Sequence, residues 1–192
     1  MFETTLLGVP LRFETAEALF SPDRVDAGTQ TMLRHVTFSP EDKVLDLGCG
    51  YGAVGIYAAK RIGAARVTMT DIDPLAVQLA KANAGLNGVP NVRVLQSDAF
   101  NGIDDTGYTL ILCNPPYHED FGVARRFIEK GFNRLALGGR MVLVVKRRLW
   151  YENKLRAIFG GAPVEKTGGY FVMTAEKRLE SYAKAKPRHH SY

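Results

Sequence analysis

The 192-residue sequence predicts one open α/β domain, because short apolar runs alternate with segments of helical periodicity along most of the chain. The run at residues 43–47 leads into a glycine-rich turn, and the run at residues 108–113 stops at two prolines. Both patterns are typical of buried parallel strands that end in loops. In open α/β sheets ligands bind at this carboxyl edge, so we expect the functional site there.

The composition is that of an ordinary globular protein, with 46% hydrophobic and 23% charged residues. The sequence shows no basic amino-terminal patch followed by an apolar run and no run long enough to span a bilayer, so we expect a soluble, cytoplasmic protein. Its two cysteines, Cys49 and Cys113, are too few and too far apart for a disulfide framework or a zinc site. We therefore expect free thiols and no metal.

The charge distribution divides the chain into a domain at residues 1–175 and a basic tail at residues 176–192. The net charge of +5 fits a polyanionic partner without requiring one. The tail is poor in apolar residues, and it is equally compatible with a solubilising terminus and with an arm that contacts RNA.

The amino-terminal part predicts a hairpin or edge strand at residues 6–13, followed by a helix. Ser21 and Pro22 supply a cap and a first-turn proline for this helix, which is expected to bury residues at helical spacing. These are Val25, Thr29, Met32, Leu33 and Val36.

A strand at residues 43–47 then runs into Gly48, Gly50 and Gly52, with a helix expected at residues 53–62. Glycines at such a turn let a ligand approach the backbone closely, although the motif alone is a weak signal. Its spacing differs from the dinucleotide fingerprint. Asp46 also precedes the glycines, where it would attract a cationic group and repel a pyrophosphate.

The next strand, residues 66–71, ends in Asp71, which lies 23 residues after Gly48 and could accept hydrogen bonds from both hydroxyls of a ribose. Asp73 and Pro74 fit the cap and first turn of the following helix. The buried stripe of that helix is expected to consist of Leu75, Leu79, Ala82 and Leu86.

A third strand at residues 92–95 precedes Asp98, which either accepts from an adenine amino group or closes an Asx turn. After the strand at 108–113, a helix is expected to end at Gly138-Gly139. Its basic row, Arg126, Lys130 and Arg134, is either a solvated face or a phosphate contact. Its buried face is predicted to hold Phe127, Ile128, Gly131, Phe132 and Leu135.

The carboxyl-terminal part predicts a strand at residues 140–146, a helix at residues 150–159 and a hairpin. Gly168-Gly169 forms the turn of this hairpin, whose second strand spans residues 170–175.

The stretch Asn114-Pro115-Pro116-Tyr117 is suited to holding a planar group that carries an amine. The Asn114 side-chain oxygen and the Pro115 carbonyl can each accept a hydrogen bond from an NH2 group, Tyr117 can stack on the ring, and the prolines stiffen the loop. Two acceptors favour a tetrahedral nitrogen whose lone pair can attack an electrophile. The two prolines alone would also fit a simple turn that ends a strand.

Together, the Asp46 to Gly52 turn, Asp71, Asp98 and Asn114 to Tyr117 resemble the motifs of class I S-adenosylmethionine-dependent methyltransferases. Residues 20–29, the extension to His118 and the Gly168-Gly-Tyr stretch are similar, more narrowly, to the methyltransferase small domain family, the catalytic half of ribosomal RNA guanine-N2 methyltransferases. The resemblance covers about residues 5–175. It implies a Rossmann-like, seven-stranded sheet with one antiparallel strand, S-adenosylmethionine as methyl donor, and RNA as substrate.

The resemblance also implies roles for individual residues. Catalysis would fall to Asn114 through Tyr117, while His118 would order the loop or touch the substrate. The implied cofactor site comprises Asp46, Gly48, Gly50, Gly52, Asp71, Ile72, Asp98, Ala99 and Asn114. In it, the glycines would line the methionine portion and Asp46 would lie near its ammonium or sulfonium.

We therefore expect direct methyl transfer to a nucleobase exocyclic amine, guanine N2 of ribosomal RNA in the first place, without a covalent enzyme intermediate. Tyr117 leaves two other targets open, because tyrosine is frequent at this position in adenine-N6 and protein glutamine-N5 methyltransferases. A non-enzymatic RNA-binding module is a further alternative, and a nicotinamide oxidoreductase is a more distant one.

Overall fold

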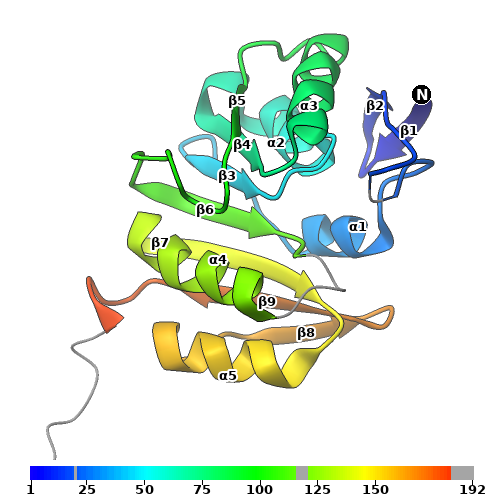
Figure 1. Cartoon of the computed structure of the whole chain (residues 1–192). Coiled ribbons are helices and arrows are strands. Elements are labelled where there is room, and N and C mark those ends of the chain that lie inside the picture. The colour runs from blue at the N-terminus through cyan, green and yellow to red at the C-terminus, as the bar shows by residue number, and fades with distance from the viewer. Residues whose placement is uncertain (20, 116–120, 183–192) are drawn as a thin grey trace, which may run out of the picture.

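The computed structural model describes residues 1–19, 21–115 and 121–182, and among these residues it contains a seven-stranded sheet (Figure 1). The strands lie in the order β5-β4-β3-β6-β7-β9-β8. The first five strands in this order, β5, β4, β3, β6 and β7, run parallel to one another. Strand β9 is antiparallel to both of its neighbours, β7 and β8. The strands are β3 (Val44–Leu47), β4 (Val67–Asp71), β5 (Arg93–Gln96), β6 (Tyr108–Cys113), β7 (Leu135–Val145), β8 (Val164–Thr167) and β9 (Tyr170–Glu176). The predicted fold class, including the single antiparallel strand, is confirmed.

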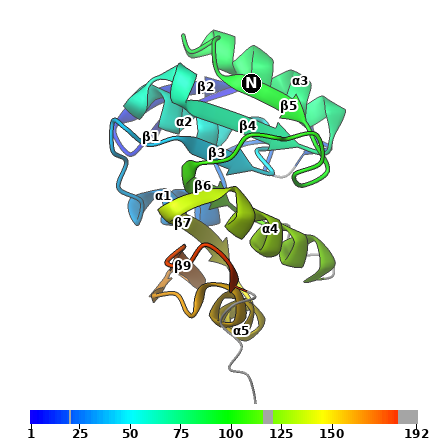
Figure 2. The same cartoon turned by 90° about the vertical axis from the view of Figure 1, so that its left-hand side faces the viewer.

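Helices cover both faces of this sheet. One buried cluster joins the sheet to α1 (Ala27–Arg34), α2 (Ala53–Ile62) and α3 (Pro74–Leu86), and a second joins it to α4 (Phe121–Arg134) and α5 (Arg148–Phe159). Figure 2 shows α4 and α5 on the side of the strands opposite α1. The central strands are therefore buried on both faces, which explains why they are continuous apolar runs. A short 3-10 turn, η1 (Ala64–Arg66), precedes β4.

The amino-terminal hairpin forms a separate two-stranded sheet. A hairpin or edge strand was predicted only for residues 6–13, but the hairpin already begins at Phe2. Strands β1 (Phe2–Leu6) and β2 (Val9–Phe13) pair antiparallel and lie next to α2 and α3 (Figure 1). Asn83 of α3 fastens the chain after β2, because its side chain accepts from the Glu14 amide at 2.7 Å and donates to the Glu14 carbonyl at 2.9 Å. The hairpin thus extends the core on the α2 and α3 face.

The prediction that Ser21 and Pro22 start a helix is wrong. Helix α1 begins at Ala27, and its N-cap is Asp26, whose carboxylate accepts from the Thr29 amide at 3.1 Å. Ser21 instead has φ 55° and donates its hydroxyl to the Arg24 carbonyl at 2.7 Å, which forms a local turn. The cap lies five residues later than expected, and it places a carboxylate near the sheet.

The expected buried stripe of α3 is correct only in the first half of the helix, where Leu75 and Leu79 are half-buried and Leu79 packs against the core. The helix begins with the predicted Asp73 cap, but Leu86 is 36% exposed and Ala82 faces solvent. The residues that face the core are mostly smaller, and they are Ala76, Val77, Ala80, Asn83 and Ala84. Small side chains let the helix lie close to the glycine turn: a Cβ added to Gly52 would lie 3.4 Å from Ala80. The close packing of α3 against the glycine turn is thus favoured over the larger apolar area that a buried leucine stripe would provide.

The prediction that Gly138-Gly139 ends a helix is wrong, because α4 already ends at Arg134 and both glycines lie inside β7. They accompany an irregular register between β6 and β7. A Cβ on Gly139 would lie 2.8 Å from the Tyr108 carbonyl oxygen, so glycine is required for the close strand contact. Leu135, expected on the buried helix face, is buried as the first residue of β7 instead.

The end of the described chain packs against α4. Inside the predicted tail, Lys177 is 8% exposed and donates to the Leu135 carbonyl at 2.9 Å, and the Tyr182 ring packs edge-on against Phe132 at 5.3 Å. Residues 183–192 lie outside the described residues. In the part of the chain that is described, no helix is long and apolar enough to cross a membrane.

Candidate functional site

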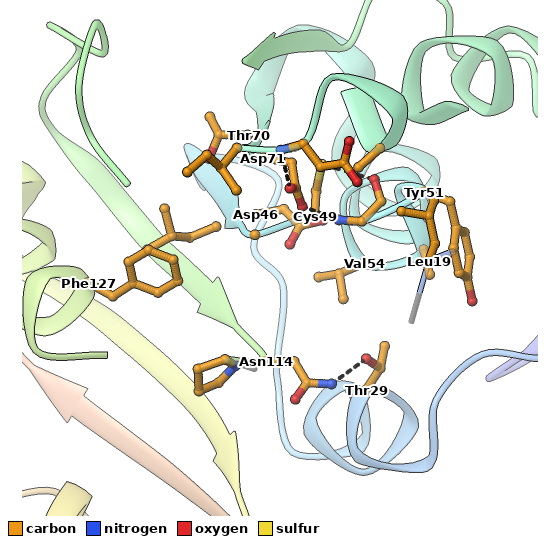
Figure 3. Close-up of a pocket in the computed structure, with 18 of the residues that line it drawn as sticks. Leu19, Thr29, Asp46, Cys49, Tyr51, Val54, Thr70, Asp71, Asn114 and Phe127 are labelled. Carbon is orange, nitrogen blue, oxygen red and sulfur yellow. Dashed lines mark hydrogen bonds between the residues drawn. The ribbon is translucent and has the colours of Figure 1, made fainter. Parts of the chain in front are cut away.

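A cavity of about 380 Å³ opens at the carboxyl ends of β3, β4 and β6 (Figure 3). Its wall comes from segments that are far apart in the sequence: the loop before α1, the glycine turn after β3, the turns after β4 and β5, the end of β6, and α4. This is the edge at which ligands bind in open α/β sheets. The lining includes nine of the predicted site residues: Asp46, Gly48, Gly50, Asp71, Ile72, Asp98, Ala99, Asn114 and Pro115. Asp73, which was predicted only as a helix cap, also lines the cavity, whereas Gly52 does not.

The glycine turn is held by hydrogen bonds to the neighbouring strand. The amides of Gly48 and Cys49 donate to the Thr70 carbonyl at 2.9 and 2.8 Å. Gly52, the third predicted glycine, has φ 100° and caps α2 by its backbone, a conformation that suits glycine and few other residues. The turn therefore brings Gly48 and Gly50, which carry no side chain, to the cavity wall together with Cys49 and Tyr51.

Asp71 braces this turn. One carboxylate oxygen accepts from the Gly50 amide at 2.8 Å, and the other accepts from the Asp73 amide at 3.0 Å. Asp73 itself caps α3 by accepting from the Leu75 amide at 2.8 Å. A carboxylate has about four acceptor positions, so Asp71 can hold the turn and still accept hydrogen bonds from a ligand.

Asp46 lies beneath the glycine turn with only 2% of its surface exposed. Its carboxylate accepts from the Gly55 amide of α2 at 2.8 Å. Burial and, to a smaller extent, the neighbouring charge of Asp71 raise the pKa of Asp46 to about 7, against the lowering effect of the Gly55 hydrogen bond. Asp46 is thus a buried carboxyl group poised to ionise near neutral pH.

The cavity is strongly acidic. Among the described lining residues, five side chains are carboxylates and one is a guanidinium, that of Arg126, which lies 3.3 Å from Asp98. The carboxylates are those of Asp26, Asp46, Asp71, Asp73 and Asp98. Such a lining favours a cationic ligand and disfavours a polyanionic one such as a pyrophosphate.

Two further features of the wall fit a nucleoside. Ile72 is 61% exposed at the cavity, an unusual position for a large apolar side chain, and it offers a flat surface to a ring. The Thr70 hydroxyl is buried and has no hydrogen-bond partner among the described residues. Sequence analysis missed Thr70, because a threonine at the end of a strand is ordinary.

Asn114 lies directly after β6, and α1 fixes its side chain. The amide nitrogen donates to the Asp26 carboxylate at 2.9 Å and to the Thr29 hydroxyl at 3.1 Å (Figure 3, for Thr29). Because an ionised carboxylate only accepts hydrogen bonds, Asp26 determines which end of the amide faces α1. The nitrogen faces α1, so the oxygen, the acceptor, faces the other way.

Asp26 and Thr29 were missed as site residues. Thr29 was expected only on the buried face of a helix, and Asp26 was given no role because the helix was expected to start earlier. The signal was the Asp26-x-x-Thr29 spacing, which fits an N-cap and its third helical residue. Of the other predicted residues, Pro115 lines the cavity beside Asn114. Pro116, Tyr117 and His118 lie outside the described residues.

The basic row of α4 contacts the protein itself. Arg126 pairs with Asp98, Lys130 donates to the Asn101 side chain at 3.3 Å, and Arg134 donates to the Asp104 carbonyl at 3.4 Å. The row therefore follows the loop after β5, a role that the sequence did not predict. No group of three or more histidine, cysteine and acidic side chains that could hold a metal ion occurs in the described ranges.

Comparison with known proteins places these features in a family. Residues 10–174 match the family model described as "Methyltransferase small domain". The chain is 35% identical to a "Ribosomal RNA small subunit methyltransferase C" from Haemophilus ducreyi, over 84% of this chain and 48% of that protein. It is 31% identical to YbxB of Bacillus subtilis, an uncharacterized protein, over 86% of this chain and 85% of that protein.

Among solved structures, the T. thermophilus 16S rRNA N2 methyltransferase RsmC, in complex with AdoMet and guanosine, matches with a TM-score of 0.83. The sequences are 30% identical, and the match covers 92% of this chain and 50% of that chain. The chain thus spans about half the length of the ribosomal RNA methyltransferases that it matches.

Proposed function

The chain belongs to the methyltransferase small domain family, and from this premise we propose that it transfers a methyl group from S-adenosylmethionine to N2 of a guanine in ribosomal RNA. The observation that carries the proposal is the Asn114 side chain, whose amide is oriented by Asp26 at the edge of an acidic cavity. This arrangement offers an acceptor to an amine and a binding site to a cationic methyl donor.

The cavity fits S-adenosylmethionine, which supplies an electrophilic methyl group when bound. Its sulfonium and ammonium groups are cations, and the acidic lining complements them. In this proposal the Gly48 to Gly52 turn lines the methionine portion and Asp46 stabilises its positive charge. Asp71 accepts from the ribose, and Ile72 packs on the adenine. Asp98, beside Ala99, accepts from the adenine amine.

The substrate amine is held by acceptors alone. The Asn114 oxygen and the Pro115 carbonyl each accept one of its protons, which favours a tetrahedral nitrogen with an available lone pair. The rate gain comes mainly from positioning, so the fixed rotamer of Asn114 matters. Stacking by Tyr117 and a loop role for His118 stay predictions, because both residues lie outside the described ranges. A base within a duplex has to be flipped out to reach this site.

Guanine N2 is preferred because of the relatives. The T. thermophilus structure with AdoMet and guanosine and the ribosomal RNA methyltransferases of other bacteria support this target and an RNA partner. The cytoplasmic location that ribosomal RNA modification would require stays a prediction, as does the division into a domain at 1–175 and a tail at 176–192.

Methyl transfer from labelled S-adenosylmethionine to unmodified ribosomal RNA tests the proposal, with the nucleosides identified by mass spectrometry after digestion. We expect label in N2-methylguanosine. Label in N6-methyladenosine would contradict the target base. Absence of label from naked RNA and from ribosomal particles, together with label in a protein glutamine, would contradict the substrate class.

A further inference from the structure

A second surface lies beside the cavity, at the same edge of the sheet. Strand β9 pairs antiparallel with β7, with Val145 opposite Phe171, so the β8 to β9 turn lies next to the turn between β7 and α5. Strands β6 and β7 are parallel, with Cys113 opposite Leu143. Both turns therefore lie on the side where Asn114 follows β6, as Figure 1 shows.

This surface combines cations with aromatic rings, and we call it the basic-aromatic strip. It consists of Phe121, Lys146, Arg147, Arg148, Lys166, Tyr170 and Phe171. All four cations are exposed, whereas Tyr170 and Phe171 are half-buried. The ammonium of Lys146 lies 5.2 Å from the centre of the Tyr170 ring, and the guanidinium of Arg147 lies 5.9 Å from that of Phe121.

Two rings of the strip, Phe121 and Phe171, pack against neighbouring side chains. Phe121 stacks on Trp150 with ring centres 4.3 Å apart and an interplanar angle of 13°. Phe171 has two cations over it, Arg148 at 5.9 Å and Lys166 at 6.0 Å. The strip therefore runs around the end of the sheet: Tyr170 packs on the side of α1, and Phe121 and Phe171 pack on the side of α4 and α5, each ring with an exposed cation beside it.

Two acidic side chains near the strip are already paired, Glu152 with Arg148 of the strip itself and Glu165 with a histidine outside it. Glu152 is shared between Arg148, at 2.8 Å, and Arg156, at 3.6 Å. Glu165 faces His35 of the segment after α1 at 3.3 Å. Arg147 and Lys166 have no acidic partner among the described residues, so the strip keeps a positive potential toward solvent.

The basic row on α4 differs from the strip, because its cations are bonded to the protein itself. Arg126, Lys130 and Arg134 each contact the loop after β5. Their charges are used to hold this loop, which supplies Asp98 to the cavity. A phosphate contact there would compete with these bonds, whereas the strip is available without breaking an ion pair of Arg147 or Lys166.

We propose that the basic-aromatic strip binds the single-stranded RNA next to the target nucleotide, an inference that rests on the proposed function. Cations that track phosphates and rings on which bases stack are the two parts of a single-strand binding surface. A base that reaches Asn114 brings its neighbours to this edge of the sheet. In this arrangement the strip binds the RNA, and the acidic cavity holds the methyl donor.

The double variant Arg147→Ala/Lys166→Ala tests the strip, and Arg61→Ala/Lys81→Ala is its matched control. The control removes two exposed cations from α2 and α3, away from the strip. The dissociation constant for a labelled single-stranded RNA is measured by fluorescence anisotropy at several salt concentrations. We expect roughly tenfold weaker binding by the strip variant, and a slope of log K against log salt that is smaller by about 1.4, as two lost phosphate contacts imply.

The control should keep the affinity and slope of the wild type, and both variants should bind S-adenosylmethionine normally by calorimetry. Unchanged RNA affinity and slope in the strip variant, or an equal loss in the control, would overturn the strip assignment. If the wild type methylates RNA and the strip variant has the same KM for RNA, the strip assignment is wrong but the proposed function stands. If the wild type transfers no methyl group to RNA, the proposed function itself fails.

Discussion

At the scale of single residues, the site depends on side chains that hold other side chains. Asp26 accepts from both the Thr29 amide and the Asn114 side chain, so one carboxylate caps α1 and orients the residue after β6. Sequence analysis identified Asn114 because its neighbours in the chain are unusual. It missed Asp26 because the partners are 88 residues apart and their contact exists only in the folded chain.

Asp26→Ser separates these two functions. Serine keeps an N-cap oxygen for the Thr29 amide but is too short to reach Asn114. We expect turnover to fall roughly tenfold to a hundredfold, because a misplaced group costs about that much, with cofactor affinity and melting temperature nearly unchanged. Asp26→Asn, whose oxygen can still accept from Asn114, should restore most of the turnover. Normal steady-state kinetics for Asp26→Ser would contradict the positioning role.

Asp46 predicts a pH dependence of stability. Its folded-state pKa of about 7 lies above the ordinary value of 3.8. Between these values the folded protein holds a proton that the unfolded chain has released, so this group's contribution is full below pH 4 and is lost as pH rises toward 7. The slope is at most about 1.4 kcal/mol per pH unit.

Urea unfolding of the ligand-free protein at pH 5, 6, 7 and 8 tests this effect. Asp46→Asn removes the titration while its oxygen can still accept from Gly55. The free energy of unfolding should therefore fall more steeply with pH in the wild type than in the variant. Parallel curves would show that Asp46 does not titrate in this range.

At the scale of elements, strands were predicted better than helix ends. The strand at 108–113 and the helix at 53–62 have the predicted bounds, because two prolines and a glycine mark their ends. The start of α1 and the end of α4 were missed. For α1, two local caps compete, and Asp26 rather than Ser21 starts the helix. For α4, a tertiary contact overrides the local signal, because the glycines at 138–139 serve strand pairing, and this pairing cannot be read from the local sequence.

Gly55 of α2 gives a test of close packing at this scale. A Cβ there would lie 2.3 Å from Cγ of Met69 and 3.2 Å from the Asp46 carboxylate. Gly55→Ala should lower the free energy of unfolding by about 1–3 kcal/mol through overpacking, although alanine favours helix. Gly85→Ala on α3, where a Cβ meets nothing within 4 Å, should instead be neutral or stabilising by up to about 1 kcal/mol. Similar melting temperatures for the two variants would contradict the packing constraint.

At the scale of the whole molecule, the order of the sheet separates two tasks. Strands β3, β4 and β5 present the glycine turn, Asp71 and Asp98 on one side of the cavity. Strands β6, β7, β9 and β8 present Asn114 and then the basic-aromatic strip. This division follows from the order of the strands, with β6 next to β3. The alternating pattern predicted parallel strands but not their order. The pairing of Asn114 with α1 did not follow from it, because the placement of α1 depends on packing.

In the proposed reaction the oriented Asn114 amide acts on the substrate amine. The most direct test is Asn114→Ala, with turnover on RNA and S-adenosylmethionine affinity measured on the same preparation. We expect turnover to fall by roughly a hundredfold or more, as when a preorganised hydrogen-bonding group is removed, while cofactor affinity by calorimetry stays within about twofold. Wild-type turnover in this variant would contradict the claim, and so would a loss of turnover that is explained by lost cofactor binding.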